Sequence, residues 1–211
     1  MDINRITSLA EFGAGWVLWL LIALSIVAVA VAIERAVLFL SSRDDIVRLR
    51  DELRVLLSRG DASAARRKLE ESPSFEARVA AAGLNADGSA SAEERIAGET
   101  ELVRLTMEKN LTVLGTLGNN APFIGLLGTV IGIVRAFREL ESSSGQVSAG
   151  LMAEIGEALV ATAVGLVVAL PAVAFFNFYQ RIIRARLARA GALGHEILAF
   201  RKSEALPAEA E

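Results

Sequence analysis

A carboxylate opens the last apolar stretch of the chain, where an ionisable side chain is costly. Glu157 precedes residues 158–178, which contain no charged side chain and are long enough to cross a bilayer. A charge in such a place usually faces a helix bundle or a water-filled path rather than lipid. The segment therefore predicts an ion or proton pathway, and the alternative is that Glu157 only forms an ion pair with Arg135 or Arg138.

Two threonines are candidates for the same pathway. If Arg135 and Glu157 mark one boundary of two antiparallel helices, Thr129 lies six residues inside it and Thr162 lies five. At about 1.5 Å per residue the depths are about 9 and 7.5 Å, which predicts both hydroxyls at one level. Repeated around an oligomer, they would form a polar ring. Alternatively, each hydroxyl bonds a carbonyl of its own helix and has no further role.

Small residues recur on these two helices at steps of three and four. The set consists of Gly125, Gly128, Gly132, Ala158, Ala161, Gly165 and Ala169. In lipid, small faces let helices approach closely, and packing and interhelical hydrogen bonds then drive association. We expect these faces to serve helix packing or assembly into an oligomer. Pro122 and Pro171 lie within the same helices and are expected to kink them.

The chain combines a high apolar content with many charges, as in a membrane protein with a substantial water-facing part. Of its 211 residues, 53% are hydrophobic and 22% are charged. A spanning helix needs about 20 mostly apolar residues, and three stretches qualify. The expected all-α division is an external segment at 1–12, spans at 13–40, 114–137 and 155–178, a cytoplasmic helical loop at 41–113, an external hairpin at 138–154, a cytoplasmic helix at 179–202 and a disordered tail at 203–211.

Hydrophobic periodicity predicts the helices of the charged loop. Apolar residues at helical spacing indicate an amphipathic helix over 44–59 that ends at Gly60. Residues 66–84 predict one or two short helices broken near Pro73, followed by a loop at 85–89. The loop should therefore fold into a water-facing helical part.

Two long helices are expected to leave the membrane on the same side. Ser91 and Glu94 have the spacing of a capping box, which predicts a helix from Ala92 that continues unbroken to Phe137. The third span is expected to continue past Tyr179. By the positive-inside rule, the basic clusters after the first and third spans belong in the cytoplasm. These clusters are Arg43, Arg48, Arg50 and Arg54, and Arg181, Arg184, Arg186 and Arg189.

Several function classes find no support in the residues. The chain has no cysteine, no His/Glu cluster with metal spacing, no nucleophile–base pair and no basic footprint for nucleic acid. We therefore expect no enzyme activity, no cofactor and no nucleic-acid partner. The interiors of the spans also lack Asp, Lys and His. That absence favours a partner that supplies a second ionisable group.

Two segments resemble a known family. Residues 121–133 (APFIGLLGTVIGI) and 157–173 (EALVATAVGLVVALPAV) are similar to the paired signatures of the MotA/TolQ/ExbB proton-channel family, most closely its ExbB and TolQ branch. The resemblance implies a bacterial inner-membrane protein with periplasmic outer segments. It also implies a homopentamer around a central pore that holds a dimer of a single-span partner resembling ExbD or TolR, whose aspartate carries the proton.

By motif position, the resemblance assigns Thr129 and Thr162 as pore threonines and Glu157 as the functionally important glutamate. The implied function is that of the pore-forming subunit of a proton-driven motor that does work on the cell envelope. Protons are favoured over sodium, because these three side chains offer few oxygen ligands for a metal ion. Two alternatives stay open, a non-conducting oligomeric membrane scaffold and an ion channel that needs no partner.

Overall fold

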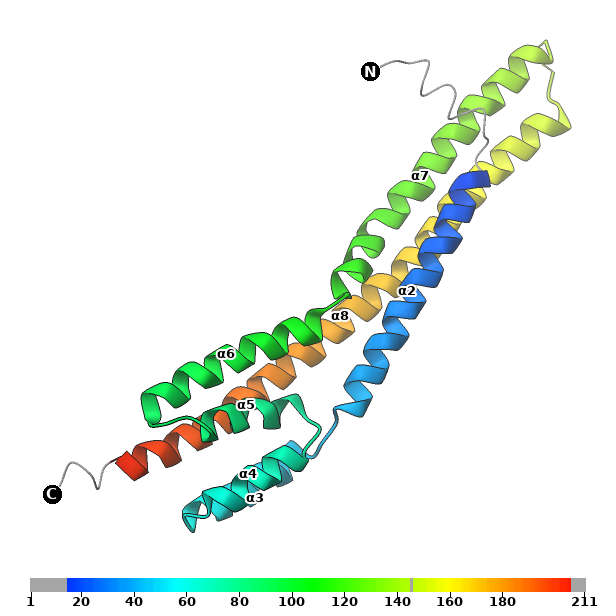
Figure 1. Cartoon of the computed structure of the whole chain (residues 1–211). Coiled ribbons are helices and arrows are strands. Elements are labelled where there is room, and N and C mark those ends of the chain that lie inside the picture. Colours follow the sequence, from blue (N-terminus) through cyan, green and yellow to red (C-terminus); the bar gives the residue numbers. More distant parts are fainter. Residues whose placement is uncertain (1–14, 145, 206–211) are drawn as a thin grey trace. The chain divides into compact units, whose positions relative to one another are not determined.

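The computed structural model describes residues 15–144 and 146–205, and this part of the chain is all helical. Three of its helices, α2, α7 and α8, contain segments long and apolar enough to cross a membrane. The expected all-α fold with three helices able to span a membrane is therefore confirmed. The helices are α2 (Gly15–Ser41), α3 (Ile46–Ser58), α4 (Ala62–Glu71), α5 (Phe75–Leu84), α6 (Ser89–Glu108), α7 (Leu111–Ser142) and α8 (Ala149–Ala205) (Figure 1).

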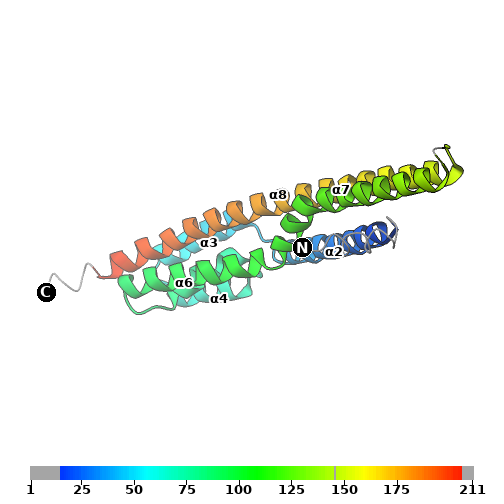
Figure 2. The same cartoon turned by 90° about the horizontal axis from the view of Figure 1, so that it is seen from above.

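The described residues form two compact units. The first unit contains α2 up to Ile33, all of α7, and α8 up to Asn177. Within it, α7 runs alongside α8 in both views (Figures 1 and 2). Apolar side chains join its three helices in one cluster that includes Val17, Ile131 and Val168. The second unit contains the rest of α2, helices α3 to α6, and α8 from Phe178 onward.

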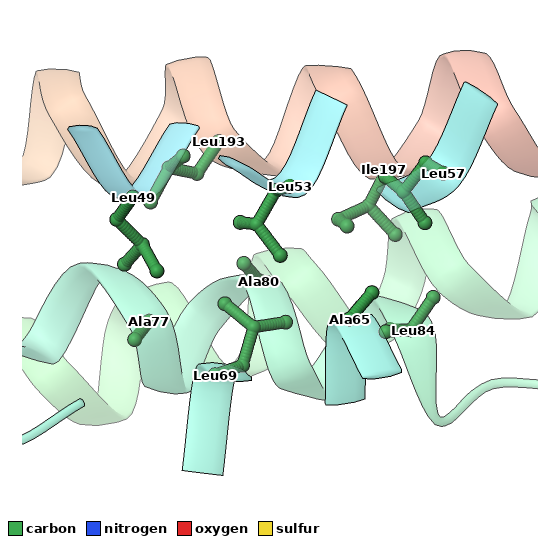
Figure 3. Close-up of a cluster of buried hydrophobic side chains, with 10 residues drawn as sticks. All are labelled: Leu49, Leu53, Leu57, Ala65, Leu69, Ala77, Ala80, Leu84, Leu193 and Ile197. Atoms are coloured by element: carbon green, nitrogen blue, oxygen red, sulfur yellow. The ribbon is translucent and has the colours of Figure 1, made fainter. Parts of the chain in front are cut away.

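The core of the second unit follows from the predicted amphipathic helix. Leu49, Leu53 and Leu57 recur every four residues, so they share one face of α3 and are buried. That face packs against α4, α5 and α8, where Leu193 and Ile197 contribute from α8 (Figure 3). The expected helix over 44–59 and the break near Pro73 are confirmed by α3, α4 and α5.

Side chains cap the start of α3 and the end of α2 in the second unit. Asp45 Oδ1 accepts the Arg48 backbone N–H at 3.1 Å at the start of α3. At the end of α2, Arg186 donates to the Phe39 carbonyl at 2.7 Å and to the Ser42 carbonyl at 3.2 Å. The last carbonyls of a helix lack partners within it and carry partial negative charge, so a buried arginine stabilises this end.

Two predictions about the helix before the second span are wrong. The chain does not stay helical from Ala92 to Phe137, because α6 ends at Glu108 and Asn110 adopts a left-handed conformation with φ 62°. Asparagine tolerates this region better than most residues, which allows a sharp interruption without glycine. The capping box at Ser91 is also unused, since α6 begins at Ser89 after Gly88, whose φ of 85° turns the chain into the helix earlier.

The last helix runs further than expected. α8 continues from Ala149 to Ala205, so its extension past Tyr179 is confirmed, whereas the predicted disordered tail is wrong at positions 203–205. Residues 206–211 and the predicted external segment at 1–12 lie outside the described residues. The expected polar connection between the second and third spans lies between Ser142 and Ala149.

Candidate ion pathway

The two predicted small faces pack against each other inside one chain. A Cβ atom at Gly125 would lie 2.8 Å from the Ala161 carbonyl oxygen, and a Cβ at Gly165 would lie 2.7 Å from the Ala121 carbonyl oxygen. Both atoms that would be struck belong to the backbone, so no side-chain rotation can relieve the overlap. Glycine at these two positions therefore sets how closely α7 and α8 approach.

The same packing continues along the helix pair. A Cβ at Gly128 would lie 2.5 Å from the Ala161 Cβ, and one at Gly132 would lie 2.5 Å from the Ala158 Cβ. Ala169 is buried in the apolar cluster that also contains residues of α2 and α7. Of the two roles expected for the small residues, helix packing within the chain is the one seen here. The expected role in assembly stays a prediction.

The contacts between α7 and α8 also set the level of the two threonines. Gly128 meets Ala161, and Thr129 and Thr162 are the next residues along each helix. Because the two helices run antiparallel, these steps lead in opposite directions, and Thr129 and Thr162 lie about two residues, or about 3 Å, apart along the helix pair. Thr162 Oγ1 donates to the Gly125 carbonyl of the neighbouring helix at 3.1 Å, whereas Thr129 Oγ1 donates to the Leu126 carbonyl of its own helix at 2.7 Å.

Arg135 pairs with a different glutamate from the one expected. Its guanidinium lies 2.8 Å from Glu154, one helical turn before Glu157, and both partners are largely shielded from solvent. The predicted boundary between Arg135 and Glu157 is thus shifted by one turn. Glu154 was missed, although it lies three residues from Glu157 on the same helix and could have been considered as the partner.

Glu157 faces the third helix of the unit. Its Oε1 lies 3.1 Å from the position that a Cβ would take at Gly15, the first residue of α2. Among the described residues, Glu157 has no ion pair, so the pairing with Arg135 or Arg138 is not formed. Glu157 is half-buried beside the start of α2. No cation of residues 15–144 or 146–205 forms an ion pair with this carboxylate at the helix junction.

Proline interrupts the hydrogen bonding of both α7 and α8. Pro122 and Pro171 lie inside these helices and lack a backbone N–H, so each leaves the carbonyl four residues earlier without its usual helical donor. A Cβ at Gly118, the residue whose carbonyl Pro122 releases, would overlap the Val173 side chain. The expectation that the prolines kink the helices stays a prediction.

The arrangement can relay hydrogen bonds but cannot by itself store a proton in midspan. Residues 16–33, 114–134 and 158–178 contain no Asp, Glu, Lys, Arg or His. Threonine hydroxyls can donate and accept hydrogen bonds, yet they do not titrate in the physiological range. A proton that passes this level therefore needs a titratable group from outside these segments.

Comparison with known proteins gives a family match over much of the chain. The sequence model of the MotA/TolQ/ExbB proton channel family matches residues 71–191, which include all the candidate pathway residues. The match begins in α4 and ends in α8. It covers more than half of the chain.

Curated relatives are similar over a shorter part. The chain is 46% identical over 79 residues to the putative biopolymer transport protein ExbB-like 2 of Helicobacter pylori. The aligned residues make up 37% of this chain and 53% of the relative. It is 37% identical over 94 residues to the biopolymer transport protein ExbB of Xanthomonas campestris pv. campestris, 44% of this chain and 37% of that protein. It is 47% identical over 88 residues to ExbB of Neisseria gonorrhoeae, 41% of this chain and 40% of that protein. The matched part thus spans about half the length of these relatives or less.

Proposed function

Because the chain belongs to the MotA/TolQ/ExbB proton channel family, we propose that it forms the wall of an inner-membrane proton channel that drives work on the cell envelope. The observation that carries the proposal is the level of Thr129 and Thr162 on two tightly packed helices. Glu157 lies on the same helix as Thr162, one to two turns away. The relatives are named as transport proteins and not as enzymes, as the sequence predicted for this chain.

The proposal includes a homopentamer that encloses a dimer of a single-span partner resembling ExbD or TolR. A partner is needed because the apolar segments offer hydroxyls but no group that stores a proton. An aspartate on the partner's span would load and release the proton while the threonines bond to it. Each proton that crosses yields about 2.3 kcal/mol per 100 mV of membrane potential, so several protons are required for substantial work.

We expect the purified protein to be a closed pentamer by native mass spectrometry in mild detergent. Reconstituted into vesicles with an imposed potential, it should take up protons only when co-purified with a single-span protein whose span bears an aspartate. Proton uptake by the oligomer alone would favour the partner-independent channel. An oligomer that stays impermeable to protons with the partner bound would favour the scaffold. A monomer would contradict the proposed assembly.

The proposed topology places the N-terminus and the hairpin around Ser144 in the periplasm and the loop around Asp87 in the cytoplasm. The chain lacks cysteine, so a cysteine introduced at either position reports on that position alone. In whole cells, an impermeant thiol reagent should label Ser144→Cys and spare Asp87→Cys, with both labelled after lysis as the control. Labelling of Asp87→Cys but not Ser144→Cys would invert the topology.

A further inference from the structure

A groove of about 440 Å³ lies in the second unit between the last turns of α2 and residues 178–189 in the middle of α8. Its walls include Phe39 and Leu40 of α2 and Phe178 and Ile182 of α8. Leu40 and Phe178 are well exposed, at 62% and 57% of their surface. The apolar walls therefore remain uncovered within the chain.

Three arginines line the same groove, and they are not equivalent. Arg186 is buried and already donates to the Phe39 and Ser42 carbonyls, so it belongs to the helix cap. Arg43 and Arg189 are exposed, and neither has a carboxylate within 4.0 Å among the described residues. These two guanidinium groups are therefore available to an anion.

No carboxylate of the described residues lines the groove itself, whereas Asp44 and Asp45 line a neighbouring pocket together with Arg189. The carboxylate of Asp44, next to Arg43, accepts a hydrogen bond from the Ser72 hydroxyl. Glu76 is buried, and its burial raises its pKa, while the charges of Arg186 and Arg189 act in the opposite direction. The basic end of the groove thus keeps a positive character.

The groove changes from apolar to basic in the same direction along both walls. On one wall, Leu40 near the end of α2 precedes Arg43, which lies two residues beyond that helix. On the other wall, Phe178 precedes Arg189 by 11 residues of α8, or about 16 Å of helix. Leu40 and Phe178 close the first and third predicted spans. The apolar walls would therefore lie at acyl-chain depth and the two arginines at headgroup depth.

We propose that this groove binds an anionic phospholipid of the cytoplasmic leaflet. Its phosphate would lie between Arg43 and Arg189, and an acyl chain would follow Leu40 and Phe178. The apolar wall favours a lipid over a free phosphate ion, and the two unpaired arginines favour an anionic over a zwitterionic headgroup. The inference rests on the proposed topology but not on proton conduction.

The test measures phosphatidylglycerol retained by the full-length oligomer, by native mass spectrometry after exchange into mixed phosphatidylglycerol and phosphatidylcholine micelles. Wild type should retain phosphatidylglycerol preferentially. The double variant Arg43→Gln, Arg189→Gln should lower that retention roughly tenfold or more, since each basic residue near a membrane surface contributes about a factor of five.

Arg181→Gln, Arg184→Gln is the matched control, because it removes two exposed arginines of α8 that do not line the groove. This control should retain phosphatidylglycerol as wild type does. Ala185→Trp fills the groove without changing charge and should also release the lipid. An equal loss of phosphatidylglycerol in the control would mean that the arginines act only by general attraction to the anionic surface, and it would overturn the proposal. Unchanged retention in Ala185→Trp would also overturn it. If a neighbouring copy of the chain occupies the groove instead, wild type would retain no phosphatidylglycerol there, and this outcome would overturn the proposal as well.

Discussion

Replacement of Thr162 by valine is expected to lower partner-dependent proton uptake roughly tenfold or more, because a hydrogen bond to a charged group contributes about 1.5–3 kcal/mol. Valine nearly matches threonine in volume but cannot hydrogen-bond. The bond from Thr162 Oγ1 to the Gly125 carbonyl would also be lost. Such interhelical bonds contribute only about 0.6 kcal/mol in membranes, so the oligomer should persist. Uptake into vesicles at an imposed potential measures the effect.

Two matched variants separate the hydroxyl from its packing. Thr162→Ser keeps the hydroxyl and should retain most of the activity. Thr106→Val removes a hydroxyl that bonds only the Leu102 carbonyl of its own helix, and it should leave uptake unchanged. Oligomer state is checked for each. Full uptake by the Thr129→Val, Thr162→Val double variant would leave both threonines as packing residues and bring the scaffold alternative forward.

Replacement of Gly165 by alanine is expected to lower Tm by roughly 2–12 °C, since overpacking typically costs about 1–3 kcal/mol. Its added Cβ would meet the Ala121 carbonyl oxygen at 2.7 Å, and relief requires α7 and α8 to separate. Gly125→Ala should behave alike, because its Cβ meets the Ala161 carbonyl oxygen. Thermal unfolding in detergent, with the oligomer followed by size exclusion, measures both.

Gly156→Ala supplies the control on the same helix. Its Cβ would have no neighbour within 4 Å, and alanine is favoured over glycine in a helix by about 1 kcal/mol. This variant should therefore keep or raise Tm. If Gly165→Ala proved as stable as Gly156→Ala, the close approach of α7 and α8 would not depend on glycine.

The three apolar helices, the amphipathic α3 and the similar depth of the two threonines follow from the amino-acid sequence alone. Each depends on local periodicity or on counting residues along a helix, which need no knowledge of distant contacts. The paired motifs at 121–133 and 157–173 likewise identified the family that the comparison confirms. Glu157 was singled out because a charge next to an apolar segment is conspicuous in the sequence alone, and its role in the pathway stays a prediction.

How these elements meet depends on contacts between distant parts of the chain. The tertiary structure paired Arg135 with Glu154 instead of Glu157, because the register of α7 against α8 is set by the glycine contacts and not by the charges. It interrupted the helix at Asn110, where local propensity gave no clear break. It also assigned Arg186 to the end of α2, 144 residues away from Ser42. Contacts between distant segments depend on packing geometry, which helical periodicity does not encode.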